Sequence, residues 1–452
     1  MIDQTILIIF AGLVGIFGEF IILKAPYLGI AFTGASLAIV DLLPDIPYVS
    51  SALPLVGLIT LVGYLISKRK GVRGPVFKFS PLHSIALVFI LWIFISNPQA
   101  AILGKSRNWM LTFAQLWILL YMAGDLLDTP RKQKAVMVVF SIFAIISAFF
   151  AIVTGGIGES VDTSIRAVGF VDNANAAARY FVVAMVFLTY LRSLTNNPAL
   201  KFLSLLGIFI TYFGVFYTVS RTGILLLFAA QGLIFLFQGK GGNRVGLILL
   251  YILGLVALWF LSQSIFDIIR SIFPTIIKGE DTLGLRYNLW ESGWLMFLDH
   301  PFRGVGIGRY IEEVGPYIYT LEGPHRWNSV AHNTYISVLS ETGVVGFGLF
   351  LTMFVTALKN FWEADVKNDP ENLTLRNAWL IAFLVMLLGG MTKSDQADKL
   401  TWMVMGLSVY YAQHAPVRKA GSVDTQVSQS LPAGPQSPLM NNPSSRSHGA
   451  RS

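Results

Sequence analysis

The sequence predicts an all-α polytopic membrane protein with about 12 transmembrane helices and one large extracytoplasmic loop that contains short helices. Hydrophobic residues make up 54% of the 452 residues and charged residues only 13%, whereas soluble domains carry about 25% charged residues. Apolar runs of about 17–25 residues recur along the chain, and each is long enough to cross a hydrocarbon core of about 30 Å. These runs lack the alternation of apolar and polar residues that a transmembrane barrel needs, so we expect helical spans.

The composition also excludes several kinds of site. The chain contains no cysteine, which rules out disulfides, thiolate catalysis and cysteine-ligated metals. The six histidines are scattered without a ligand spacing to carboxylates, so we expect no metal site and no cofactor. Much of the net charge of +8 lies in short loops between apolar runs, where it sets the topology; it does not indicate nucleic acid as a partner.

The apolar runs give the expected spans in chain order. The first run has no basic flank before it, so we expect a membrane segment and not a cleaved signal peptide. Because prolines interrupt the early runs, the sequence allows a total of about 12 or 13 spans. With boundaries good to about 2–4 residues, the expected spans are residues 3–23, 27–43, 53–67, 81–97, 109–127, 135–153, 174–191, 202–219, 222–238, 245–265, 332–358, 377–391 and 399–413.

Basic residues in the short loops orient these spans, because cytoplasmic loops are enriched in Lys and Arg. When every basic loop is placed in the cytoplasm, the spans alternate without contradiction from residue 68 onward. Residues 266–331 then form a large extracytoplasmic loop between an N-terminal group of helices, residues 1–265, and a C-terminal group, residues 332–414. Residues 415–452 are rich in Ser, Pro, Gly, Gln and Asn, and we expect a disordered cytoplasmic tail.

His332 stands at the end of the large polar loop, where the next apolar run begins. Asn328 or Ser329 is expected to cap a helix that starts near His332. The positive end of a helix dipole favours the neutral imidazole, which can accept a proton as a general base must. The alternative is an interfacial histidine that only hydrogen-bonds a neighbouring loop, and the sequence favours neither.

Two arginines fall on the same extracytoplasmic face. Arg221 lies in a very short turn between two apolar runs, where a guanidinium offers planar donors suited to phosphate; the alternative is snorkelling to lipid headgroups. Arg286 opens a helix on which Trp290 and Trp294 follow at four-residue intervals, and we expect this stripe to face the membrane. The alternative for Arg286 is an ordinary solvated or ion-paired arginine.

A third arginine, Arg166, lies in a loop rich in Gly and Asn that leads into a helix. Asn173 or Asn175 is expected to cap that helix. Arg166 serves either a ligand or the loop itself.

The region around His332 contains two further features. Glu341 would be costly inside the membrane without a partner, so we expect a helix break at Gly343 and a bracing role for Glu341 at that turn. Residues 300–308 (HPFRGVGIG) are glycine-rich, but no Gly-Lys-Ser/Thr follows and no strand precedes them. We therefore interpret this segment as a turn that returns the loop to the membrane, and not as a phosphate loop.

Taken together and in the order in which they occur along the chain, these motifs resemble those of the bacterial O-antigen ligase and polymerase superfamily. His332-Asn333 is followed after nine residues by GVVG at 343–346, and SRTG at 220–223 precedes both. Arg286 before Trp290, the HPFRGVGIG segment and residues 166–175 are also similar. The resemblance covers roughly residues 166–346.

This resemblance implies a helical, membrane-embedded (GT-C-like) glycosyltransferase of the bacterial inner membrane. Such an enzyme moves a glycan from undecaprenyl diphosphate to an acceptor hydroxyl on the extracytoplasmic side. The acceptor belongs to a glycolipid such as a lipid A–core sugar, to another lipid-linked glycan, or to a protein. Ligase-type transfer ranks first, ahead of a polysaccharide polymerase or a protein O-oligosaccharyltransferase. A rival class is a non-enzymatic transporter or flippase of lipid-linked sugars, which would place ionisable residues near the bilayer midplane.

The resemblance also assigns expected roles to residues. His332 matches the histidine that activates the acceptor hydroxyl. Arg221 and Arg286 match the arginines that hold the lipid diphosphate, and Arg166 matches a further phosphate or sugar contact. The supporting positions are Asn333, Glu341 and Trp290, and a family carboxylate near the last spans matches either Asp395 or Asp398.

Overall fold

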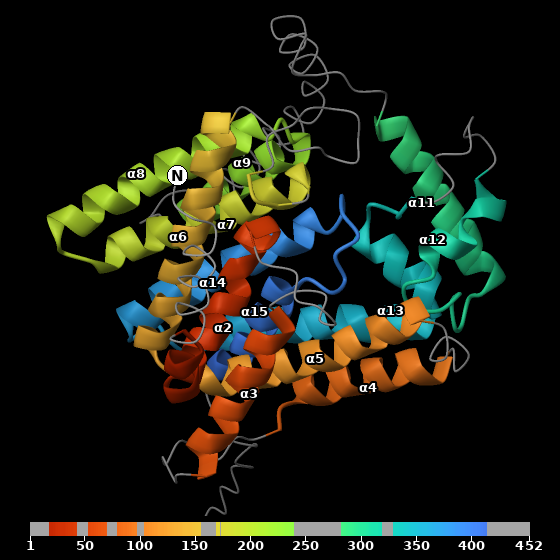
Figure 1. Cartoon of the computed structure of the whole chain (residues 1–452), viewed down its shortest axis with the longest axis horizontal. Helices are drawn as coiled ribbons and strands as arrows, with labels where there is room; N and C mark the ends of the chain where they lie inside the picture. The colour runs from red at the N-terminus through yellow and green to blue at the C-terminus, as the bar shows by residue number, and fades with distance from the viewer. Residues whose placement is uncertain are drawn as a thin grey trace, which may run out of the picture. The chain divides into compact units, whose positions relative to one another are not determined.

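The computed structural model describes residues 18–42, 53–69, 79–96, 104–154, 169–171, 173–238, 282–318 and 329–413. Across these ranges the protein is helical and has no strand, which confirms the all-α class (Figure 1). The elements are α2 (Pro26–Ala35), η1 (Ser36–Leu42), α3 (Leu53–Arg69), α4 (Pro81–Ser96), α5 (Gly104–Leu126), α6 (Pro130–Thr154), α7 (Ala174–Leu194), α8 (Pro198–Tyr217), α9 (Arg221–Gln238), α11 (Thr282–Asp299), α12 (Tyr310–Glu313), η2 (Gly315–Tyr317), α13 (Thr334–Glu363), α14 (Pro370–Gly389) and α15 (Lys399–Ala412).

Prolines and short polar side chains fix where these helices begin. The helices α2, α4, α6, α8 and α14 start with proline, whose missing N–H and fixed φ suit the first turn. At five helix starts, two of which also have the proline, a side-chain oxygen accepts the backbone N–H groups that a helix start leaves unpaired. These capping residues are Asn173 for α7, Asn197 for α8, Asn333 for α13, Asp369 for α14 and Asp398 for α15.

Seven of the described helices are long and apolar enough to cross a membrane: α5, α6, α7, α8, α9, α13 and α14. Three shorter apolar segments, in α2 with η1, in α3 and in α4, have the same composition. The chain is therefore a multi-pass membrane protein. The expected span 245–265 and most of the expected span 3–23 lie outside the described residues, so the count of about 12 spans stays a prediction.

Two other regions meet the sequence expectations only in part. The described section of the large loop, residues 282–318, forms α11, α12 and η2, so this section does contain short helices. Residues 414–452, which include the whole expected tail 415–452, lie outside the described residues, so the disordered tail stays a prediction. The helix α15, at the last expected span, has 14 residues, and α2, at the second, has 10.

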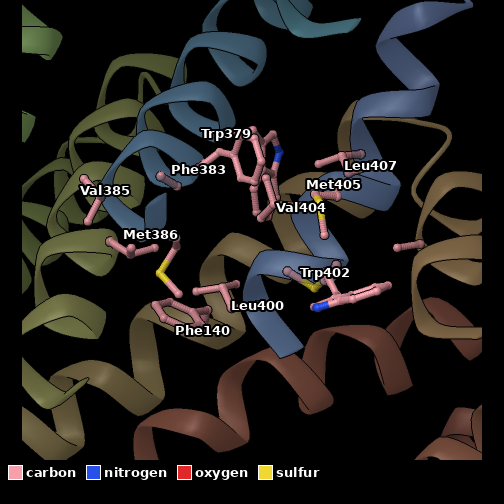
Figure 2. Close-up of a cluster of buried hydrophobic side chains, with 14 of the residues drawn as sticks. Phe140, Trp379, Phe383, Val385, Met386, Leu400, Trp402, Val404, Met405 and Leu407 are labelled. Carbon is pink, nitrogen blue, oxygen red and sulfur yellow. The ribbon is translucent and has the colours of Figure 1, made fainter. Parts of the chain in front are cut away.

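The core of the bundle lies around α7, α14 and α15. Nearly the whole length of α7 is buried, and Trp379 of α14 and Trp402 of α15 are buried completely. Figure 2 shows Met386 of α14 beside Phe140 of α6 and Leu400 of α15. Trp379 and Phe383 lie further along α14, and Trp402 of α15 belongs to the same cluster. Outer helices instead expose large apolar side chains, as a lipid-facing surface requires; examples are Leu91, Ile146, Phe202, Phe209 and Phe213.

The helix α13 runs beside α4, and α4 runs beside α5 (Figure 1). On its other side α5 packs closely against α15, because glycine occupies the crossing point. A Cβ on Gly406 of α15 would overlap the carbonyl oxygen of Leu120, and one on Gly124 of α5 would lie 2.8 Å from the carbonyl oxygen of Gly406. Small residues let helix backbones approach in this way. This packing sets the position of α15.

Gly406→Ala should therefore destabilise the protein, since the new methyl group forces α5 and α15 apart at a cost of about 1–3 kcal/mol. Gly348→Ala in α13 is the matched control, because a Cβ at that position has no neighbour within 4 Å. Equilibrium unfolding in detergent compares the two variants. Equal stability of both variants would contradict the close packing of α5 and α15.

Candidate functional site

His332 lies directly before the start of α13. The side-chain oxygen of Asn333 accepts two backbone N–H groups of the first turn, at 2.9 and 3.2 Å, and α13 begins at Thr334. The expectation that Asn328 or Ser329 caps this helix is therefore wrong. Asn333 has the extended backbone (φ −155°, ψ 115°) and the side-chain oxygen that a cap needs, one position beyond the histidine.

The backbone of His332 is held in an uncommon conformation. Its φ is +48°, in the left-handed region that residues other than glycine rarely adopt. The preceding residue, Ala331, is fully buried, and its carbonyl accepts a hydrogen bond of 2.9 Å from the indole N–H of Trp290 in α11. Trp290 on one side and the capped helix on the other thus fix the half-buried histidine. Residues in such backbone regions cluster at functional sites.

The first turn of α13 is attached to the loop between α14 and α15, residues 390–398. The backbone N–H of Thr334 donates to the carbonyl of Gly390 at 2.7 Å. The Thr334 hydroxyl donates to the carbonyl of Lys393 at 2.7 Å and accepts the backbone N–H of Asp395 at 2.9 Å. One threonine, two residues after His332, therefore ties this loop to the histidine.

The same loop is attached to α7 by a buried ion pair between Arg179 and Asp395. The Arg179 side chain is only 2% exposed, and Gly389 has no room for a Cβ because the arginine stem passes over it. The ammonium of Lys393 lies 3.3 Å from the same carboxylate. Burial by itself would raise the pKa of Asp395, but the charges of Arg179 and Lys393 outweigh burial and hold that pKa below its usual value.

Our sequence reasoning did not single out Arg179. A signal was present, because Arg179 is a charged residue within the expected span 174–191, and ionisable residues inside spans are rare and commonly functional. Asp395 was considered only as one of two carboxylates that the resemblance allows. The partnership of the two residues, which are 216 positions apart, is visible only in the structure.

Arg221 is the first residue of α9, and the residue before it is hydrogen-bonded to α7. The preceding residue, Ser220, accepts the backbone N–H of Gly223 at 3.0 Å through its hydroxyl oxygen, and the same hydroxyl donates to the side-chain oxygen of Asn175 at 2.7 Å. Asn173, and not Asn175, caps α7. This cap leaves Asn175 to connect the starts of α7 and α9, so that half-buried Arg221 lies near the start of α7.

Arg286 lies on α11, one turn before Trp290, and is half-buried. Trp290 points toward the loop that carries His332, because its indole donates to Ala331. The expectation that this stripe faces the membrane stays a prediction, and this hydrogen bond adds a contact with the loop that the sequence did not predict. Trp294 is 47% exposed and packs its ring near that of Phe297. Trp290 is held against the loop because the backbone carbonyl of Ala331 satisfies its indole N–H.

Hydrogen bonds and one ion pair thus connect the segments that carry Arg221, Arg286 and His332. They run from α9 to α7, from α7 to the loop 390–398, from that loop to the start of α13, and from residue 331 to α11. We call this region the His332 end of the bundle. Arg166 lies outside the described residues, so its place in the site stays a prediction.

The chain carries an O-antigen ligase domain. Residues 206–351 match the O-antigen ligase family. The match confirms the resemblance to the O-antigen ligase and polymerase superfamily, and it contains Arg221, Arg286 and His332. Arg179 and Asp395 lie outside the matched segment. No curated protein matches the chain.

Within the O-antigen ligase domain, the glycine-rich segment after α11 packs against a kink in α13. Gly343 interrupts the helix with φ +67° and ψ −175°, at the break that the sequence predicts. The backbone N–H groups of Val305 and Gly306 donate to the carbonyls of Ser340 and Glu341 at 3.0 and 2.8 Å. A Cβ on Gly343 would overlap the backbone of Phe302. The glycines are therefore needed for backbone contact between these two segments.

The Glu341 side chain strengthens this contact. It is 2% exposed, and its carboxylate accepts the backbone N–H of Tyr310 at 3.2 Å. The side-chain amide of Gln396 lies 3.5 Å from its other oxygen. Glu341 thus connects the O-antigen ligase domain to the loop 390–398, which is a structural arrangement and places no substrate on this carboxylate.

Two hollows lie among the described helices. A groove of about 620 Å³ runs along α2, α3 and α5, with mainly apolar walls that include Leu58, Leu111 and Met122. A smaller cavity of about 220 Å³ lies between α7 and the loop 390–398. Lys399, the first residue of α15, contributes to the wall of both. In the described ranges, no three His, Asp or Glu side chains gather as a metal site would require.

Arg179→Met should destabilise the protein by about 3 kcal/mol or more, because removing one partner leaves a buried carboxylate without its main counter-charge. The double variant Arg179→Met/Asp395→Asn should recover part of that loss. Arg192→Met, at an exposed position on the same helix, is the matched control and should have little effect. Unfolding midpoints in detergent compare the stabilities of these variants. A double variant less stable than Arg179→Met would contradict the pairing.

Proposed function

We propose that the protein is a metal-independent, inverting glycosyltransferase that moves a glycan from undecaprenyl diphosphate to an acceptor hydroxyl. O-antigen ligase-type transfer is the form that we favour. The observation that carries this proposal is the linkage of Arg221, Arg286 and His332 to one end of the bundle by hydrogen bonds between their segments. A base and two phosphate-binding cations at one place are what such a transfer needs.

The proposed reaction is a single in-line displacement. The acceptor oxygen forms a bond to the anomeric carbon while the bond from that carbon to the diphosphate oxygen breaks, so the configuration inverts. The imidazole of His332 takes the hydroxyl proton. The electron pair of the broken bond leaves with the diphosphate, and Arg221 and Arg286 stabilise its growing negative charge, where preorganised donors act most strongly. Arginine supplies this positive charge without a metal ion.

The charge distribution along the helices supports an extracytoplasmic site in the bacterial inner membrane. The helices α7 and α13 begin at the His332 end and carry Arg192 and Lys359 near their opposite ends. Basic residues mark the cytoplasmic side, so the His332 end faces outward. A transporter would instead hold its ionisable groups near the midplane, whereas His332 and Arg221 stand at helix starts.

The groove along α5 supports a lipid carrier. Its wall extends from Asn108 to Met122 on that helix, which is about 21 Å at the helical rise. This length exceeds half the thickness of a hydrocarbon core of about 30 Å. The groove is lined mainly by apolar side chains, so we propose that it takes the polyprenyl chain.

His332→Ala should lower glycan transfer by about 10²–10⁴-fold, the usual contribution of a general base. His332→Asn should do the same, and asparagine tolerates the left-handed backbone, so misfolding cannot explain its loss. His300→Ala, at an exposed histidine of the same domain, serves as the control. The assay uses purified protein, a lipid-diphosphate glycan and candidate acceptors, with the product identified by mass. Normal transfer by His332→Asn would remove the base assignment.

Arg286→Lys should lower transfer although the charge is kept, because a planar two-point contact to phosphate is lost. A lost hydrogen bond to a charged group costs about 1.5–3 kcal/mol, so we expect roughly a 10- to 150-fold decrease. Arg303→Lys, at an exposed position of the same domain, is the control. Initial rates over a range of donor concentrations provide the comparison, and wild-type rates for Arg286→Lys would exclude Arg286 from the site.

A further inference from the structure

The small cavity at the His332 end has the composition of a binding site. Its volume is about 220 Å³, and its wall contains two rings, Trp109 and Tyr180. The charged residues of the wall are Lys393, Asp395, Asp398 and Lys399. The backbone of Asp395 is bonded to Thr334, two residues from His332. The cavity therefore lies beside the candidate site and not on a remote surface.

Both carboxylates of the cavity are already engaged. Asp395 is paired with Arg179 and with Lys393. Asp398 accepts the hydroxyl of Tyr180 at 3.0 Å on one oxygen, and on the other it accepts the backbone N–H and the hydroxyl of Thr401, each at 2.7 Å. These bonds engage both oxygens of each carboxylate.

Lys399 is a further cation of the cavity. It is half-buried in the cavity wall, and within the described part of the chain its ammonium makes no hydrogen bond and no ion pair within 4 Å. The charge of Asp398, its neighbour in sequence, acts on Lys399 at a distance, but the two side chains form no ion pair within 4 Å. Lys399, Arg179 and Lys393 together supply three positive charges. The carboxylates Asp395 and Asp398 supply only two negative charges. A partly buried charge without a close partner favours an incoming anion.

The aromatic part of the wall is rigid. The ring of Trp109 packs against Gly308 so closely that a Cβ at that position would overlap the ring, and it also lies near the ring of Phe113. Tyr180 is buried and bonded to Asp398. Fixed rings of this kind present apolar faces on which the C–H faces of a sugar ring can pack, while polar groups around them bind its hydroxyls.

We propose that this cavity binds one sugar of the transferred or accepting glycan, that this sugar carries a carboxylate or phosphate group, and that Lys399 receives that group. The assignment to a sugar rests on the proposed glycan transfer. The preference for an anion rests only on the charges of the cavity. The protein would then select acidic glycans over neutral ones of equal size.

The test measures the binding of three probes to the full-length protein in lipid nanodiscs: glucuronate, glucose 6-phosphate and glucose. Saturation-transfer difference NMR is suited to such weak ligands. We expect at least one anionic probe to bind wild-type protein about tenfold more tightly than glucose, a difference of about 1.4 kcal/mol. Lys399→Gln should remove this preference and Lys399→Arg should keep it. Lys367→Gln, which removes an exposed lysine between α13 and α14, should leave binding unchanged.

Equal binding of the anionic probes and glucose to wild-type protein would overturn the proposal, and so would an unchanged anion preference in Lys399→Gln. Inorganic phosphate is the fourth probe. If phosphate binds as tightly as glucose 6-phosphate, the site takes a free anion and the assignment to a sugar fails. No donor or transfer step is involved, so this result is independent of the His332 variants. A failure of the transferase proposal and a failure of the anion site are therefore distinguishable.

Discussion

The buried ion pair between Arg179 and Asp395 is the constraint on which the His332 end depends. A charge inside a bundle is tolerated only when a partner neutralises it, and here the partner comes from a loop 216 positions away in the sequence. Because the backbone N–H of Asp395 also donates to the Thr334 hydroxyl, the pair fixes the loop 390–398 against both α7 and α13. The matched O-antigen ligase segment thus relies on a contact made entirely outside it.

A second constraint is the close approach of two backbones inside the O-antigen ligase domain. The kink at Gly343 opens α13 so that its carbonyls can accept N–H groups from the glycine-rich segment after α11. The buried carboxylate of Glu341 then binds that segment at Tyr310 and approaches Gln396. These bonds join α11, α13 and the loop 390–398, so the orientation of Arg286 on α11 and of His332 before α13 is coupled.

The distribution of polar and apolar surface agrees with a site at a membrane boundary. Helices α4, α6 and α8 expose apolar side chains, while the Arg179–Asp395 ion pair and the hydrogen bonds of the His332 end lie near the starts of α7, α9, α13 and α15. Lys399 lies where the two regions meet, since it lines both the apolar groove and the small polar cavity. A substrate with a lipid tail and a charged sugar head would be matched by this arrangement.

The sequence alone determined the all-α membrane class, most helix positions, the break at Gly343 and the superfamily, because apolar runs and motif spacing are local properties of the chain. It missed the cap at Asn333 and the hydrogen bond from Trp290 to Ala331, and it did not identify Arg179. Each of these depends on which distant group completes a hydrogen bond or an ion pair, and chain order does not specify that choice. Only the tertiary structure could bring Arg179 to Asp395 and Trp290 to Ala331.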